Sequence, residues 1–70
     1  MVTPDGKVAI NRATEADLRR LPGIGATRAQ AILALRDKLG GKFKRPEDLL
    51  KVKGLGRKSL ARLRPLVIVD

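Results

Sequence analysis

A chain of 70 residues can form one small domain with a modest core, and its lack of Cys, His, Trp and Tyr leaves few routes to catalysis. Lys and Arg number 16 against 7 Asp and Glu, and the net charge of +9 favours a polyanionic partner, nucleic acid first. No apolar run approaches the ~20 residues that a membrane span needs.

The first half of the chain predicts a helix, a tight turn and a second helix. "KVAI", residues 7 to 10, is β-branched and is expected to be extended. Thr14 with Asp17 three residues on predicts an N-cap and a short helix over residues 14 to 20. "LPGIG" at 21 to 25 then makes a Gly-x-Gly turn. The next apolar residues recur at helical spacing until two glycines end the helix: Ala29, Ile32, Leu33, Leu35, Leu39, then Gly40 and Gly41.

The same order returns 31 residues later. "TEADLRRLPGIGATRAQAI" aligns with "RPEDLLKVKGLGRKSLARL", which indicates one supersecondary unit used twice. The second copy predicts a short helix over 46 to 51, a turn at "VKGLG", and a helix that carries Leu60 and Leu63 and ends near Pro65. The final "LVIV" is again expected to be extended, and the two extended flanks are candidates for a two-stranded contact.

The paired glycines admit two interpretations. In the structural one, Gly23, Gly25, Gly54 and Gly56 permit positive φ in sharp interhelical turns. In the functional one, a glycine turn that opens a helix also presents unpaired backbone N–H groups to a phosphate. Dinucleotide and P-loop cradles do not fit, because both turns lack the third glycine and no G-x-x-x-x-G-K-[ST] run occurs.

"LPGIGATRAQAI" and "VKGLGRKSLARL" resemble the two hairpins of a tandem helix-hairpin-helix domain, over residues 10 to 69. With the joining "GKFKRPEDL", the chain is similar to the DNA-binding domain of the ComEA family of competence receptors. The resemblance implies an all-α fold with short extended termini, in which hairpin 1 (about 14–39) and hairpin 2 (about 46–64) are related by pseudo-two-fold symmetry. It implies binding of double-stranded DNA without base reading, through phosphates on either side of the minor groove.

Carried over from that family, the phosphate-facing positions belong to the turns and the helix starts after them. They are Gly23, Ile24, Gly25, Thr27 and Arg28 in the first hairpin, and Gly54, Leu55, Gly56, Arg57 and Lys58 in the second. The side chains of Ile24 and Leu55 are expected to stay in the core while their main chains make contacts.

Charge is concentrated in the second hairpin. Residues 42 to 64 hold nine basic and two acidic side chains, net +7, against +3 for residues 1 to 41. Lys53, Arg57 and Lys58 flank the turn and are expected to attract phosphates, so the second turn should dominate electrostatic capture. Phe43, the only aromatic residue, is expected to anchor the linker in the core. The lack of further aromatic residues disfavours binding of single strands by base stacking.

Protein interaction and enzyme activity are the alternatives to DNA binding. Helix hairpins are also scaffolds for protein interaction or dimerisation, which stays as the alternative. The chain is predicted not to be an enzyme, without catalytic residues, metal, cofactor or small-molecule substrate, because Asp17 and Asp48 fit first-turn helix positions. The family receptor carries an N-terminal membrane anchor that this chain lacks. The resemblance therefore implies either a periplasmic or cell-surface domain whose anchor was removed, with a role in DNA uptake, or a free-standing cytoplasmic relative.

Overall fold

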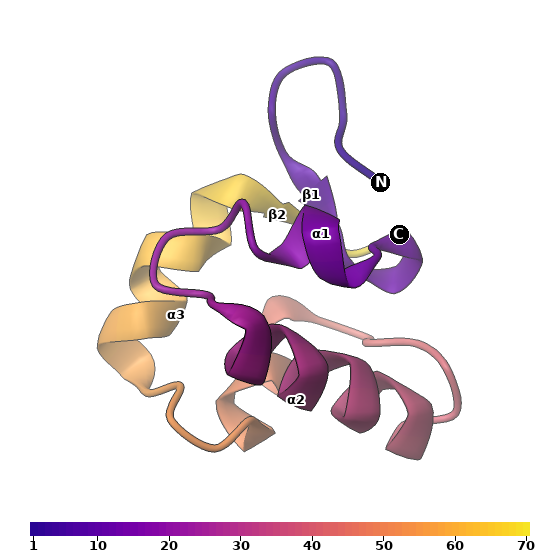
Figure 1. The fold of residues 1–70 in the computed structure, drawn as a ribbon, viewed down its shortest axis with the longest axis vertical. Helices are drawn as coiled ribbons and strands as arrows, with labels where there is room; N and C mark the ends of the chain where they lie inside the picture. Colours follow the sequence, from indigo (N-terminus) through magenta and orange to yellow (C-terminus); the bar gives the residue numbers. More distant parts are fainter.

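Short helical segments make up most of the architecture, and a two-stranded sheet joins the two ends of the chain (Figure 1). The computed structural model describes residues 1–70. In chain order the elements are β1 (Val8–Ala9), the 3-10 helix η1 (Ile10–Arg12), α1 (Glu15–Leu18), α2 (Ala26–Lys38), the 3-10 helix η2 (Pro46–Lys51), α3 (Arg57–Leu63), the 3-10 helix η3 (Arg64–Leu66) and β2 (Val67–Ile68). The predicted helical class is confirmed.

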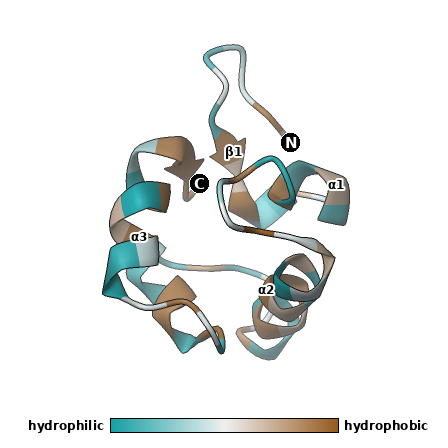
Figure 2. Cartoon of the chain, turned by 60° about the vertical axis from the view of Figure 1, so that its left-hand side comes forward, coloured by the Kyte–Doolittle hydropathy of each residue, from teal (hydrophilic) through white to brown (hydrophobic).

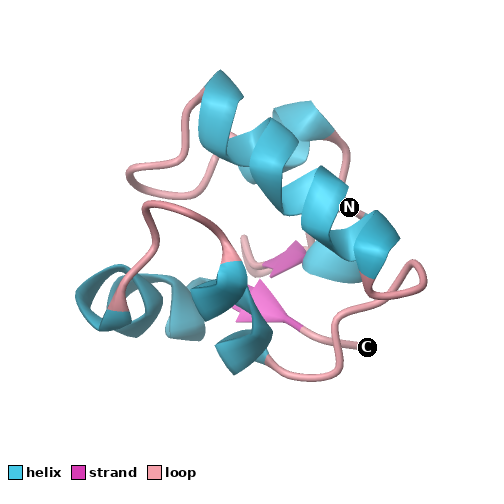
Figure 3. Ribbon diagram, turned by 90° about the horizontal axis from the view of Figure 1, so that it is seen from below, coloured by secondary structure: helices cyan, strands magenta, loops and turns pink.

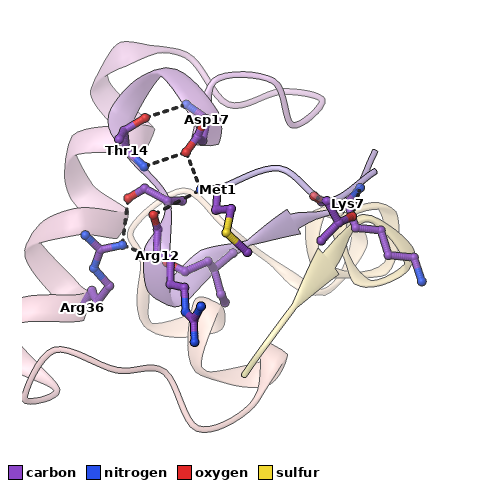
Figure 4. A network of polar contacts seen from close by, with 9 residues as sticks. Met1, Lys7, Arg12, Thr14, Asp17 and Arg36 are labelled. Atoms are coloured by element: carbon purple, nitrogen blue, oxygen red, sulfur yellow. Dashed lines mark hydrogen bonds and ion pairs between the residues drawn. The ribbon is translucent and has the colours of Figure 1, made fainter. Parts of the chain in front are cut away.

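Helix α1 begins where the capping pattern predicts it. The Thr14 hydroxyl accepts a hydrogen bond from the Asp17 N–H at 3.2 Å, and the Asp17 carboxylate accepts one from the Thr14 N–H at 3.1 Å (Figure 4). Such a box pairs two of the N–H groups that a helix start leaves without partners. In the same view Arg36 of α2 donates to the carbonyls of Ile10 and Ala13, both at 2.9 Å, and so ties α2 to the chain before α1.

Helix α2 ends at the two glycines, as its sequence predicts. Gly40 and Gly41 have φ angles of 84° and 97°, in the left-handed region that favours glycine. The Gly41 N–H donates to Arg36 O at 2.8 Å and the Gly40 N–H to Asp37 O at 3.1 Å. This pair of bonds is a Schellman motif, which satisfies carbonyls at the helix end and turns the chain back behind α2 (Figure 1).

The second copy differs from the first in helix type. Residues 46 to 51 form a 3-10 helix with Pro46 in its first turn, where the predicted element was a short helix of unspecified type. Helix α3 ends at Leu63, before Pro65, but helical backbone continues to Leu66 as η3. Pro65 was expected to mark the end of the last helix. It is instead tolerated in the first turn of η3, because a residue there does not have to donate a backbone hydrogen bond.

The two extended flanks pair with each other, which confirms the predicted contact. Strands β1 and β2 are parallel, with Val8 opposite Val67 and Ala9 opposite Ile68 (Figure 3). The Asn11 side chain accepts from the Phe43 N–H at 2.6 Å and donates to the carbonyls of Phe43 and Asp70 at 3.0 and 3.1 Å. The side-chain amide of Asn11 therefore joins the N-terminal part of the chain, the linker and the C-terminal residue.

A single cluster of buried apolar residues lies between the helices and the sheet, and both copies of the repeat contribute to it. The sheet strands are brown in the hydropathy view, while helices α2 and α3 contain both brown and teal residues (Figure 2). Phe43 is 2% exposed, so its predicted role as the linker's anchor in the core is confirmed. None of the helices combines the length and the apolar character that crossing a bilayer requires.

Candidate functional site

The two Gly-x-Gly turns have the same backbone conformation. Gly23 and Gly54 have φ angles of 76° and 92°. After each of them, the N–H of the central apolar residue donates back to a carbonyl three residues earlier: Ile24 to Leu21 at 3.2 Å, and Leu55 to Val52 at 3.1 Å. Positive φ is accessible to glycine at little cost, so this first glycine of each turn is required by the bend itself.

Between the glycines, the side chains of Ile24 and Leu55 point into the core. They are 5% and 7% exposed, which confirms that these residues can offer only main-chain atoms to a ligand. Burying these side chains at the tip of each bend holds the turn backbone on the surface of the core.

The second glycine of each turn has no such conformational reason. Gly25 and Gly56 have φ angles of −93° and −108°, which any residue can adopt, so positive φ does not explain all four glycines. A Cβ built on either residue meets no atom within 4 Å. Packing inside the chain therefore does not demand glycine here either, and the space beside both residues is open to solvent.

Backbone donors face that open space. Gly25 and Gly56 each begin a helix, and each accepts its helix's first hydrogen bond, from Ala29 and Leu60, both at 2.9 Å. The N–H groups of residues 25 to 28 and 56 to 59 have no acceptor within the chain. An open hollow of about 370 Å³ lies over the first set, lined by Gly25, Ala26, Thr27 and Arg28. A row of free N–H groups can hold an oxyanion.

Arg28 lies between the two turns. Its guanidinium donates to the Gly23 carbonyl at 3.0 Å, and its Nε would be 3.2 Å from a Cβ at Gly54. Figure 3 shows the two turns facing one another on one side of the molecule. The family resemblance predicts Arg28 to be one of the phosphate-facing residues. In the structure it also lies against Gly54 of the second turn, which nothing in the spacing of the repeat could reveal.

The other predicted side chains are free of internal partners. Thr27, Lys53, Arg57 and Lys58 are exposed, and none makes a hydrogen bond or ion pair through its side chain. By contrast, most carboxylates are already engaged with the chain's own donors and cations; these are Asp5, Asp17, Glu47, Asp48 and Asp70. The positive charge beside the turns is therefore left to face solvent.

Asp17 and Asp48 occupy the helix-start positions that the sequence predicts. The N–H of Lys44, at 2.9 Å, is the main reason that the pKa of Asp48 lies below its usual 3.8. The pKa of Asp17 is also lowered, first by its hydrogen bond from the Met1 ammonium and then by the Thr14 N–H (Figure 4). Both carboxylates stay ionised near neutral pH and serve as hydrogen-bond acceptors for the backbone.

Comparisons with known proteins agree with this geometry. Residues 4–68 match the family model described as helix-hairpin-helix motif. ComE operon protein 1 of Bacillus subtilis is 39% identical over 62 residues, covering 89% of this chain and 30% of that protein. An uncharacterized protein of Haemophilus influenzae is 41% identical over 63 residues, covering 89% of this chain and 55% of its own length. The chain thus spans between about a third and about half of these two relatives.

A further relative corrects the prediction that the chain is not an enzyme. Endonuclease/exonuclease/phosphatase family domain-containing protein 1 of Danio rerio is 43% identical over 64 residues, which is 91% of this chain and 12% of that protein. The prediction is contradicted, because the same sequence unit occurs in proteins named for an enzyme-family domain. The shared stretch is the helix-hairpin-helix segment alone, so the likeness assigns no reaction to it.

Proposed function

The chain belongs to the helix-hairpin-helix family, and from this premise we propose that it binds double-stranded DNA through backbone phosphates, without reading base sequence. Free N–H groups at both turns would hold phosphate oxygens. The exposed Lys53, Arg57 and Lys58 would add attraction, and Thr27 would add a hydroxyl donor.

The observation that carries this proposal is the open space at Gly25 and Gly56. Neither φ nor internal packing requires glycine at these positions, yet both copies have it. A side chain there would occupy open space at the start of each run of free N–H groups. Approach of an external group to the backbone explains both glycines, since a phosphate oxygen has to come within about 3 Å of an N–H to accept its hydrogen bond.

We infer that hairpin 1 (about 14–39) and hairpin 2 (about 46–64) are related by pseudo-two-fold symmetry. The matching φ angles at Gly23 and Gly54 and the matching turn hydrogen bonds support this relation. A pair of such turns suits the two strands of a duplex, one turn to each strand across the minor groove. Arg28, which bonds to the first turn and lies against Gly54 of the second, would help to keep the two phosphate sites at a fixed separation.

The cellular role that fits best is capture of DNA during uptake in natural transformation. The likeness to ComE operon protein 1 and the resemblance to the competence receptors support this role. In that role indifference to base sequence is expected, because an uptake receptor meets DNA of every sequence. The sequence also offers no set of Asn, Gln and Arg residues suited to reading bases in the major groove, since Gln30 is its only Gln.

A fluorescence-anisotropy titration across salt tests the proposal. Four to six phosphate contacts give a slope of log affinity against log salt of roughly −4 to −5. Two labelled duplexes of unrelated sequence should give the same affinity, and the matching single strand should bind more weakly. Charge reversal at Arg57 and Lys58 should abolish binding. A slope near zero, or no binding to any duplex, would refute phosphate recognition and leave the protein-interaction alternative.

A further inference from the structure

A second basic surface adjoins the second hairpin turn. Two hollows, each of about 190 Å³, lie along the groove between α2 and the segment that turns back behind it. The first is lined from α2 by Ala31, Ala34, Leu35 and Lys38, and from the other side by Lys51, Val52 and Lys53. The second is lined by Leu39, Lys42, Lys44, Asp48 and Lys51. Lys51 lines both hollows, so they adjoin, and together we call them the groove.

Five lysines give this groove its charge, and we name them the lysine track: Lys38, Lys42, Lys44, Lys51 and Lys53. All five are exposed, and none of their ammonium groups makes an ion pair with a carboxylate of the chain. The one acid in the groove, Asp48, accepts the Lys44 N–H and lies 3.9 Å from the Arg45 guanidinium. The acid next to Lys38 on α2, Asp37, lines neither hollow. Apart from the attraction between Asp48 and Lys51, the charge of the track is not neutralised by the chain's own carboxylates.

Chain geometry joins the lysine track to the turns. Lys53 directly precedes Gly54, so one end of the track is part of the second hairpin turn. Lys38 is the last residue of α2, twelve residues from the helix start beside the first turn, or about 18 Å at 1.5 Å per residue. A DNA strand presents one phosphate per roughly 3.4 Å of duplex axis, so this length has room for several phosphates.

We propose that the lysine track binds further phosphates of the duplex that the hairpin turns hold, which extends the footprint beyond the minor groove. The inference rests on the proposed function. Lysine suits this role, because a flexible ammonium is a point charge that meets a phosphate without fixed geometry. An acidic protein segment could also enter such a groove. Continuity with the turn through Lys53 favours the duplex.

The test compares two variants that lose the same charge. Lys38→Gln/Lys42→Gln/Lys44→Gln and the control Lys7→Gln/Arg12→Gln/Arg64→Gln both lower the net charge from +9 to +6. The control residues lie off the track and are paired with Asp5, Asp70 and Glu47. Losing three phosphate contacts should make the salt slope of the track variant less steep by about 2 to 3. The control should change it by less than about 1, because its charges act only from a distance. Circular dichroism serves to check that both variants fold.

Each other outcome overturns the inference. Equal slopes for the two variants would show that only net charge matters. A track variant that keeps the wild-type slope but loses affinity for polyglutamate would make an acidic protein segment the occupant. Failure of the wild-type chain to bind any duplex would remove the proposed function as well. By contrast, tight wild-type binding that depends on the turn glycines but not on the track would refute this inference alone.

Discussion

Gly56→Ala separates recognition by the turn from the stability of the turn. Its φ of −108° suits alanine, and the added Cβ meets no atom within 4 Å. Alanine is a poorer N-cap than glycine by roughly 1 kcal/mol, but it also stabilises the fold by ~0.4–1 kcal/mol because it reduces the entropy of the unfolded chain. These effects oppose each other. We therefore expect the free energy of unfolding to change by less than about 1 kcal/mol, or a few degrees in Tm for a domain of this size.

Binding should respond far more strongly. The added methyl group lies where a phosphate would approach the free N–H groups that follow Gly56. Hydrogen bonds to a charged group contribute about 1.5–3 kcal/mol each, so loss of one weakens duplex affinity roughly 10- to 100-fold. Anisotropy with a labelled duplex gives the affinity, and urea unfolding gives the stability of the same preparation.

Gly40→Ala is the matched control, because it should lower stability without changing duplex affinity. Its φ of 84° strains alanine, and it lies at the far end of α2 from the turns. It should cost about 1–2 kcal/mol of stability and leave the affinity of the folded protein unchanged. If Gly56→Ala bound duplex as tightly as the wild type, no phosphate would approach this backbone, and the reasoning from the open glycine would fail.

Three further predictions concern other residues. Arg57→Gln/Lys58→Gln should make the salt slope of duplex binding less steep by about 2. Arg28→Gln should change this slope by less than about 1, because Arg28 already bonds to its own turn. The opposite ranking would refute the idea that the second turn dominates electrostatic capture. Asn11→Ala should lower the free energy of unfolding in urea by about 1–3 kcal/mol, since it leaves three backbone groups without their partner. The lowered pKa of Asp48 means that its contribution to stability is present above the ordinary value of 3.8 and is lost as pH falls through the folded pKa. Stability of Asp48→Asn should therefore fall less in acid than that of the wild type.

Local patterns predicted the helical elements well, because each is defined by residues close together in sequence. The capping box at Thr14 and the paired glycines after Lys38 fix the ends of α1 and α2 through contacts within a few residues. The repeat also identified both turns. Its glycines, however, looked equivalent in sequence, and only the backbone angles separate Gly23, which the bend requires, from Gly25, which it does not.

Contacts between distant residues were not predictable in the same way. Nothing in the composition of η2 distinguishes a 3-10 helix from one turn of α-helix, since the choice depends on packing. The position of Arg28 against Gly54 depends on how the hairpins meet, and so does the grouping of Lys38 with Lys51 in one groove. In the sequence alone, Lys38 is one of the seven basic residues of the less charged first half.

Pairing of the two ends of the chain has a consequence for the order of folding. Val8 and Val67 are opposite each other in the sheet, and Asn11 bonds to the carbonyl of Asp70, 59 residues away. Closing a loop of that length costs about 3–4 kcal/mol of chain entropy, and such long-range pairings slow folding. During synthesis, α2 and its glycine cap can form from local contacts alone, whereas the sheet has to wait until β2 has emerged. We expect a chain cut before residue 66 to retain helical segments but to lose the fixed spacing between its two turns.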